Sequence, residues 1–169
     1  VKAAETGVDA LIIQDLGAAK IAKTVCPDMP IHASTQLTAS NMYDVKDFQD
    51  RGFSRVVLSR ELSEKEINHI YTETGAEIEA FAHGALCISF SGKCLMSSFI
   101  GGRSGNRGMC AQPCRMEYAD GSYPLSLKDL SLLDSLPQLM ADGVTEVYNL
   151  KYIDRGYQRF EQKLRALGA

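Results

Sequence analysis

The sequence lacks the features that would reveal its chemistry at a glance. Its 169 residues contain neither His-Glu-x-x-His, the zinc-peptidase motif, nor Gly-x-Ser-x-Gly, the nucleophile turn of serine hydrolases. No apolar run approaches the roughly 18 residues that a membrane span requires. The net charge of −3 is too small to attract nucleic acid over the whole surface. These absences predict a soluble, cytoplasmic protein that would contact a polyanion only through local patches.

Length and composition indicate about one folded domain. The chain is 45% hydrophobic and 23% charged, which excludes a disordered or low-complexity protein. It begins with Val1 rather than Met, so we expect a single domain over residues 1–169 that is truncated at its N-terminus.

One further absence is local. Residues 81–116 contain no Asp or Glu, and four of the five cysteines lie inside this stretch in the pattern Cys-x6-Cys-x15-Cys-x3-Cys. Its charges are all basic, and glycines are frequent. Four thiolates with cations around them suit a metal centre. We therefore expect a Cys-rich loop at 83–116 whose metal ligands are Cys87, Cys94, Cys110 and Cys114.

Other fates of these cysteines stay open. Two disulfides would be the default in a small secreted protein, although a chain of this length does not need them. Zinc also accepts four thiolates, but only Cys110 and Cys114 form the short hook typical of zinc sites. Unligated core cysteines usually pack among aliphatic residues rather than Gly, Ser and Arg. Cys26, which precedes Pro27, is expected to be structural.

Short apolar runs alternate with amphipathic segments along the chain. Ser63, with Glu66 three residues later, predicts a capping box at the start of a helix over 64–74. Further helices are expected at 18–24, 39–49 and 130–140, and strands at 8–13, 30–35, 55–58, 77–82, from 125 and at 144–148. Strand and helix in alternation predict an α/β fold with a parallel sheet.

A partial TIM-like (β/α) barrel with a Cys-rich loop insertion is the natural closure of such a sheet. A complete barrel has eight strands and typically about 250 residues, more than this chain can supply. We therefore expect the open sheet edge to be covered by a second copy of the chain or by a missing N-terminal segment.

Strand alternation selects candidate site residues. In the run from Glu77 to His83, a period of two places Glu77, Glu79, Phe81 and His83 on one face. In a barrel that face points inward, and Glu79 and His83 lie towards the carboxyl end, where barrel enzymes carry out their chemistry. The same logic aligns His32, Ser34 and Gln36 and places Arg60 at the carboxyl end of its strand. A structural role for His32 is equally compatible with the pattern.

Two long segments resemble a known family. Residues 79–97 (EAFAHGALCISFSGKCLMS) and 106–115 (NRGMCAQPCR) look like the signature of the collagenase-like peptidases, peptidase family U-32. The resemblance extends to His32-Ala-Ser-Thr-Gln, Leu58-Ser-Arg-Glu-Leu-Ser and Pro124-Leu-Ser-Leu-Lys-Asp, and so covers roughly residues 1–135. It implies a (β/α) barrel. Members of the family include proteins for oxygen-independent hydroxylation of RNA bases and of ubiquinone precursors, whose matching cysteines are implied to bind a 4Fe-4S cluster.

These observations lead to three functional hypotheses. The favoured one is iron–sulfur-dependent hydroxylation of a base in tRNA or rRNA, with catalytic Glu79, His83 and Arg60 and with substrate-binding His32, Gln36, Arg103, Arg107 and Arg115. The second is proteolysis of a peptide substrate, in which His83 would activate Cys87. The third is a non-catalytic binding domain stapled by a four-cysteine centre, with zinc as the alternative metal.

Overall fold

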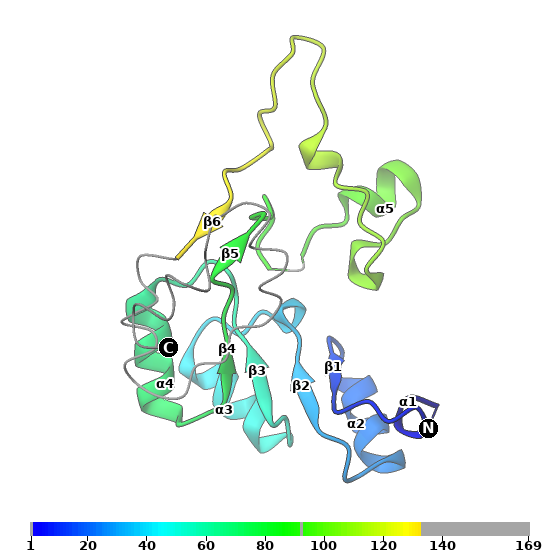
Figure 1. Ribbon diagram of the computed structural model, residues 1–169, viewed down its shortest axis with the longest axis vertical. Helices are drawn as coiled ribbons and strands as arrows, with labels where there is room; N and C mark the ends of the chain where they lie inside the picture. Colours follow the sequence, from blue (N-terminus) through cyan, green and yellow to red (C-terminus); the bar gives the residue numbers. More distant parts are fainter. Residues whose placement is uncertain (1, 92, 133–169) are drawn as a thin grey trace, which may run out of the picture. The chain divides into compact units, whose positions relative to one another are not determined.

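The computed structural model describes residues 2–91 and 93–132 (Figure 1). The chain is divided into two compact units, Val1–Ser131 and Leu132–Ala169. The expected single domain over 1–169 stays a prediction, since the second unit lies outside the described residues apart from Leu132. None of the described helices is both long enough and apolar enough to cross a membrane.

The described elements alternate between strand and helix over the first half of the chain. They are α1 (Lys2–Glu5), β1 (Leu11–Ile13), α2 (Leu16–Val25), β2 (Ile31–Ala33), η1 (Thr35–Leu37), α3 (Met42–Asp50), β3 (Arg55–Val57), α4 (Glu64–Thr74), β4 (Ile78–Glu79), β5 (His83–Gly84), α5 (Met96–Gly101), η2 (Gly105–Arg107), η3 (Pro113–Arg115) and β6 (Leu130–Ser131). The predicted α/β class is confirmed.

A four-stranded parallel sheet organises the first unit. Its strand order is β1-β2-β3-β4, so each strand pairs with the next one along the chain. Residues Ile12, His32 and Arg55 are successive register partners across the first three strands, and Val57 is the partner of Glu79. Because register partners share a face, His32, Arg55 and Glu79 lie on the same side of the sheet.

The other face of the sheet carries the core. Ile31, Ala33 and Val56 are fully buried there, and α3 packs on β3 and on α4. The helices contribute Val45, Phe48, Ile67 and Ile70, all buried. Burying one such side chain contributes roughly 1.5 to 3 kcal/mol. The hydrophobic pattern thus fixes which face of the sheet meets the helices and leaves the polar face for a site.

Local capping explains the helix boundaries. Helix α4 spans Glu64–Thr74 as predicted, and the carboxylate of Glu66 accepts hydrogen bonds from the amide (2.7 Å) and hydroxyl (2.6 Å) of Ser63. Helix α3 begins at Met42, not at 39 as predicted. The reason is Asn41, whose side-chain oxygen accepts hydrogen bonds from the amides of Tyr43 and Asp44 and so caps the helix.

The prediction of a continuous strand over 77–82 is wrong. β4 ends at Glu79, and His83 belongs to β5, which pairs antiparallel with β6. The Leu58 amide still donates to the Glu79 carbonyl, but the next donor in the ladder, the Arg60 amide, donates to the hydroxyl of Ser91 instead. The hydroxyl of Ser91, 31 residues away in sequence, therefore takes the place of a backbone carbonyl of the neighbouring strand.

The C-terminal part of the described chain also differs from expectation. Leu130 and Ser131 form β6 rather than the start of the predicted helix 130–140, and Leu125 lies in a turn rather than a strand. Pairing with β5 explains the first difference, because it satisfies backbone groups that a helix would otherwise use. The remainder of that helix and the predicted strand 144–148 lie outside the described residues.

Candidate functional site at the carboxyl edge of the sheet

Charged side chains gather on the sheet face opposite the helices. Arg55 on β3 forms an ion pair with Glu77, to which its Nε also donates a hydrogen bond of 2.6 Å. Its Nη1 lies 3.7 Å from a carboxylate oxygen of Glu79 on β4. The guanidinium is about one quarter exposed, whereas both carboxylates are more open. Arg55 thus holds two acidic side chains of the neighbouring strand.

His32 belongs to the same charged group. Burial lowers the pKa of His32 below its ordinary value of 6.5, and the positive charge of Arg55 lowers it further. Glu77 and Glu79 oppose these two effects. The imidazole therefore favours its neutral form near neutral pH, in which one ring nitrogen can accept a hydrogen bond.

Arg60 and His83 line one small pocket. Its volume is about 160 Å³, and its walls are Arg60, Phe81, His83, Gly84, Ala85 and Leu130. The guanidinium carbon of Arg60 lies 4.4 Å from the ring centroid of Phe81, a cation–π contact that orients the arginine. Two of the three predicted catalytic residues are therefore brought together, whereas Glu79 is not part of the pocket wall.

Ser91 attaches residues 83–116, called the cysteine-bearing segment below, to the loops that follow β2 and β3. The residue is fully buried. Its amide and hydroxyl donate hydrogen bonds of 2.9 and 2.8 Å to the two carboxylate oxygens of Glu61. The hydroxyl of Thr38 donates to the Ser91 carbonyl at 3.0 Å, from a left-handed backbone that is unusual for a β-branched residue. The loop after β1 adds a third attachment, since Gln14 Nε2 donates to the Asn106 carbonyl at 2.5 Å.

These attachments place the cysteine-bearing segment at one edge of the sheet. Gln14, Thr38 and Glu61 follow β1, β2 and β3 respectively, so all three lie at the carboxyl ends of parallel strands. Ligand and active sites of open parallel sheets and of (β/α) barrels form at that edge. Cys26 lies apart, at the opposite edge, because it ends α2 and precedes the start of β2.

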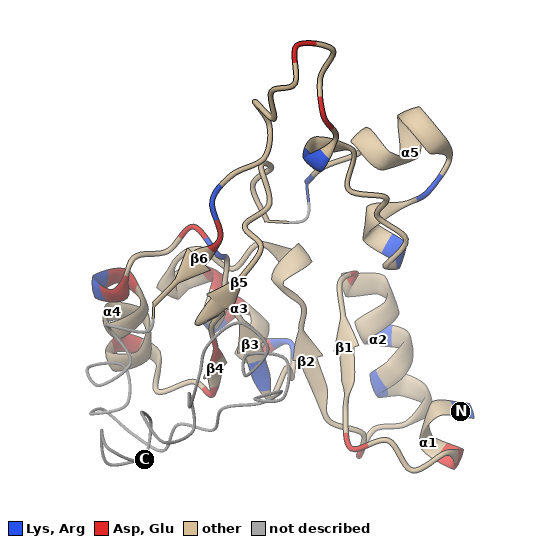
Figure 2. Ribbon diagram, turned by 45° about the horizontal axis from the view of Figure 1, so that its top comes forward, with Lys and Arg blue, Asp and Glu red and all other residues tan. Residues whose placement is uncertain are grey.

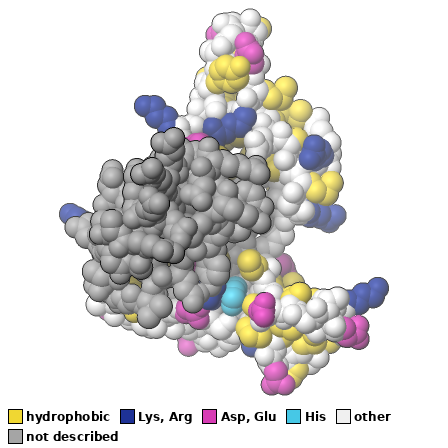
Figure 3. All heavy atoms as spheres, viewed as in Figure 1, with side chains coloured by type: hydrophobic (Ala, Val, Ile, Leu, Met, Phe, Trp, Pro, Cys, Tyr) yellow, Lys and Arg dark blue, Asp and Glu magenta, His cyan; other side chains and the backbone are white. Residues whose placement is uncertain are grey.

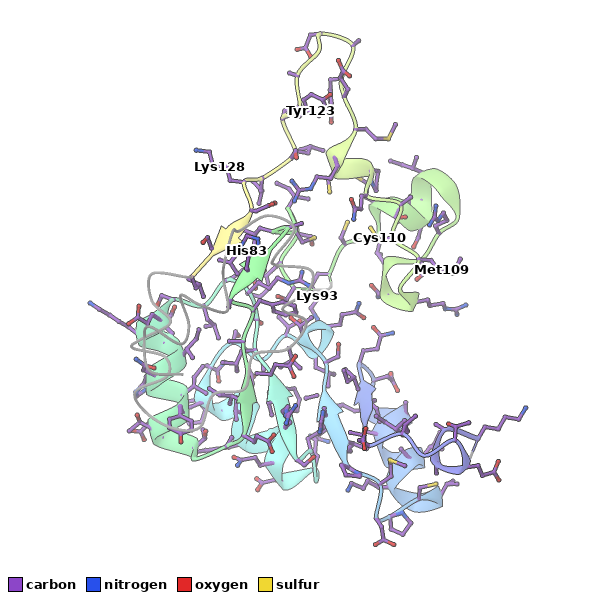
Figure 4. All side chains as sticks on the ribbon, in the orientation of Figure 1. His83, Lys93, Met109, Cys110, Tyr123 and Lys128 are labelled. Carbon is purple, nitrogen blue, oxygen red and sulfur yellow. The ribbon has the colours of Figure 1, made fainter. Side chains whose placement is uncertain are left out.

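Two hydrogen bonds and the close approach of one glycine connect the neighbourhoods of the four cysteines. Buried Ser97 accepts a hydrogen bond of 2.9 Å from the amide of Ala111, next to Cys110. A Cβ placed on Gly105 would lie 3.7 Å from Cβ of Cys110 and 3.9 Å from the carbonyl oxygen of Cys94. Arg115 Nη2 donates to the Leu86 carbonyl at 3.0 Å, which joins the residue after Cys114 to the residue before Cys87. Figure 4 shows Cys110 on this segment, with His83 on β5.

The thiols themselves are free and partly hydrogen-bonded. All five cysteines are free, so the disulfide alternative is not observed. Cys94 and Cys110 each accept a hydrogen bond from the amide two residues later, at 3.4 and 3.3 Å. Amide donors of this kind stabilise thiolate ligands, so the donor set fits an iron–sulfur group. Among residues 2–91 and 93–132, however, no three His, Cys, Asp or Glu side chains are arranged to hold a metal ion. The four-thiolate centre stays a prediction.

The basic residues of the segment differ in their hydrogen bonds and in their exposure to solvent. Arg115 donates to Leu86, to the hydroxyl of Ser126 and to the carbonyl of Leu127, so its guanidinium holds loops together. Arg103 is exposed and uses only Nε within the described part of the chain, donating to the Met109 carbonyl at 3.1 Å. Arg107 is exposed as well. Gln36 lies on η1, beside the Thr38 contact.

Comparison with known proteins identifies the family. The model of peptidase family U32 matches residues 1–148 of this chain. The chain belongs to peptidase family U32. No solved structure matches it.

Curated U32 relatives carry different names. The "tRNA hydroxylation protein P" of Escherichia coli K12 is 48% identical over 115 residues, which are 68% of this chain and 25% of the relative. The "23S rRNA 5-hydroxycytidine C2501 synthase" of the same organism is 46% identical over 150 residues, 83% of this chain and 22% of that protein. A "Collagenase" of Porphyromonas gingivalis W83 is 33% identical over 172 residues, 88% of this chain and 41% of that protein. The matched region thus covers between 22% and 41% of the length of these relatives.

Sequence reasoning missed three residues of the site. Arg55 organises Glu77 and Glu79, and Glu61 with Ser91 attaches the cysteine-bearing segment to the sheet. A signal for Arg55 was present, since a charged residue at the start of an otherwise apolar strand lies on the same face as the neighbouring polar positions. No sequence pattern pairs Glu61 with Ser91, because 30 residues separate them.

Proposed function

We propose that this chain forms part of an iron–sulfur-dependent enzyme that hydroxylates an RNA base. The observation that carries the proposal is the cysteine-bearing segment, which Gln14, Thr38 and Glu61 fasten to the carboxyl edge of a parallel sheet. Identity of 46 to 48% with two proteins named for RNA hydroxylation supports the choice of reaction. We propose a cytoplasmic location, which the names of these RNA-modifying relatives support.

We propose further that the sheet is part of a TIM-like barrel. Four parallel strands in sequential order, each pairing with the next, are the arrangement from which such barrels are built. The polar face with His32, Arg55 and Glu79 would then line the barrel interior. Within the described part of the chain the sheet has two edges, and we propose that a missing N-terminal segment or a second copy of the chain covers the open edge.

Cys87, Cys94, Cys110 and Cys114 would hold a 4Fe-4S cluster. The cluster supplies electron transfer when bound, and the amides that donate to Cys94 and Cys110 would tune its potential. The contacts between Leu86 and Arg115 and between Ser97 and Ala111 hold the segments that carry the ligands. Zinc in the same thiolate set is the alternative metal.

The chain's own polar groups would bind and orient the base. Arg60, fixed over Phe81, offers guanidinium donors in the pocket that it shares with His83. His83 would accept or donate a proton at the base, and Glu79 would act from the polar face where Arg55 holds it. His32, kept neutral by burial, and Gln36 complete the substrate-binding set.

Modified nucleosides in cellular RNA provide the test. We would delete the gene for the intact protein, restore it as wild type, H83A or C110S, and analyse tRNA and rRNA nucleosides by mass spectrometry. We expect one nucleoside that is heavier by one oxygen atom to disappear on deletion and to return only with the wild type. Tyr43, which is exposed on α3, supplies a control, since Y43A should restore the modification fully.

The deletion strain and the purified protein together distinguish the competing functions. Unchanged RNA after deletion would refute hydroxylation. Cleavage of gelatin by purified protein that depends on Cys87 and His83 would instead support the peptidase reading, which the identity to the named collagenase favours. Colourless protein that binds zinc stoichiometrically and supports neither activity would favour the binding domain.

A further inference from the structure

An exposed aromatic side chain stands out on the surface of the cysteine-bearing segment. Phe99 on α5 is 85% exposed, the most open of the large hydrophobic residues described, and its neighbour Ile100 is 69% exposed. Leaving a phenyl ring in water forfeits a substantial hydrophobic contribution. An exposed ring within a charged surface is typical of a site that binds a partner through its face.

The charged side chains of the stretch that carries Phe99 are all of one sign. Residues 81–116 contain no carboxylate, and their charged side chains are Lys93, Arg103, Arg107 and Arg115. Figure 2 shows basic residues but no acidic ones along α5 and the turns that follow it. In Figure 3, basic and hydrophobic side chains lie next to one another on this part of the surface. The surface is therefore complementary to a polyanion with flat apolar groups.

Two hydrogen bonds within the segment orient Arg103. Its amide donates to the carbonyl of Ser97 at 3.2 Å, which folds the residue back onto α5. Its Nε donates to the Met109 carbonyl at 3.1 Å, and this bond fixes the guanidinium plane. Within the part of the chain that the structure describes, both Nη groups stay available. Two Nη groups oriented in this way suit a phosphate, which can accept two parallel hydrogen bonds from them.

We infer that Phe99 and Arg103 form a docking surface for an unpaired stretch of RNA, with a base stacked on the ring of Phe99 and the adjoining phosphate on Arg103. Unstacked bases in loops present their faces to aromatic side chains, whereas the bases of a duplex are already stacked. Met109 immediately precedes Cys110, so a strand bound at Arg103 lies beside a proposed cluster ligand. The inference rests on the proposed function and specifies its substrate as single-stranded or loop RNA.

Binding of short RNAs to the intact protein tests the inference. The probes are a labelled hairpin with an unpaired loop and a fully paired duplex of the same composition. We expect the wild type to prefer the hairpin. F99A should weaken hairpin binding by about 5- to 150-fold, the range for loss of one base–aromatic stack. F99W should retain the affinity, and F99L should behave like F99A because it is apolar without a π-face.

The contribution of charge to RNA binding is measured separately, through the dependence of the affinity on salt. R103A should reduce the slope of log affinity against log salt by about one unit, whereas F99A should leave that slope unchanged. Y43A on α3 is the matched control for an exposed ring, and R51A is the control for an exposed arginine, since Arg51 pairs with Asp47 away from the segment. Thermal melting of each variant establishes that it is folded.

The outcomes separate this inference from the proposed function. Equal affinity of F99A and F99L to the wild type, with cellular hydroxylation intact, would overturn the docking surface and leave the proposed function standing. Equal binding of duplex and hairpin would likewise overturn the preference for unpaired RNA. Loss of hydroxylation in F99A cells, rescued by F99W, would support both.

Discussion

Arg115 donates a hydrogen bond of 3.0 Å to the carbonyl oxygen of Leu86, across 29 residues of sequence. The contact joins the residue that follows Cys114 to the residue that precedes Cys87. It therefore closes the cysteine-bearing segment on itself, and further donors from Arg115 attach Ser126 and Leu127 to the same point. Sequence reasoning assigned Arg115 to substrate binding, and that assignment stays a prediction beside these internal partners.

Replacement of Arg115 should weaken the metal centre. R115A removes the donor to Leu86, and loss of a supporting contact behind metal ligands typically costs about 10- to 100-fold in metal affinity. Iron and sulfide analysis after anaerobic reconstitution, with a competing chelator, measures this loss. R51A is the matched control, because Arg51 pairs with Asp47 of α3, outside the segment. Equal iron content in both variants would contradict the role assigned to Arg115.

Replacement of Ser91 should destabilise the attachment of the segment to the sheet. S91A removes a buried hydroxyl that donates to the Glu61 carboxylate and accepts from the Arg60 amide, so both hydrogen bonds are lost. The expected cost is about 1 to 3 kcal/mol in the free energy of unfolding, measured by urea denaturation. S89A should change little, because among the described residues that hydroxyl donates only to the adjacent carbonyl of Phe90. A loss confined to S89A would refute this account.

Stability should fall with acidification through His32. Its pKa is lowered in the folded protein, so below about pH 6.5 the unfolded chain takes up the proton more readily than the folded one. The contribution is therefore fully present above that pH and is lost as the pH falls towards the folded pKa. Unfolding of wild type and H32Q between pH 5 and about 8 measures it. The two curves should converge at low pH, and parallel curves would contradict the prediction.

Arg60 and His83 should affect activity more than folding. Both line the same pocket, and Arg60 is about as exposed as other pocket residues rather than part of the core. In the intact protein, R60A and H83A should abolish RNA hydroxylation in cells while thermal unfolding changes by no more than a few degrees, as expected for a loss near 1 kcal/mol. Unfolded H83A protein whose remaining folded fraction keeps full specific activity would show that His83 is structural.

Local signals were enough to predict helices α2, α3 and α4 and the parallel sheet that they accompany. Ser63 and Glu66 predict the start of α4 because a cap is satisfied within one helical turn, and Gly75 ends it with a left-handed backbone. The apolar runs around Ile31 and Val56 predict β2 and β3 because side-chain burial sets their pattern. Even the shift of α3 to Met42 was readable from Asn41, a strong N-cap.

Contacts over long sequence separations had to come from the tertiary structure. The end of β4 depends on Ser91 taking the hydrogen bond of Arg60, and β6 exists because His83 and Gly84 pair with Ser131 and Leu130. Neither the hydrogen bond between Arg60 and Ser91 nor the pairing of β5 with β6 produces a periodic pattern of residues in the sequence. The residue types of the site, including the four cysteines and the carboxylate-free stretch, follow from the sequence alone because composition carries the chemistry. Which arginine braces a loop and which one faces outward follows only from the fold, because identical guanidinium groups differ solely in the carbonyls that surround them.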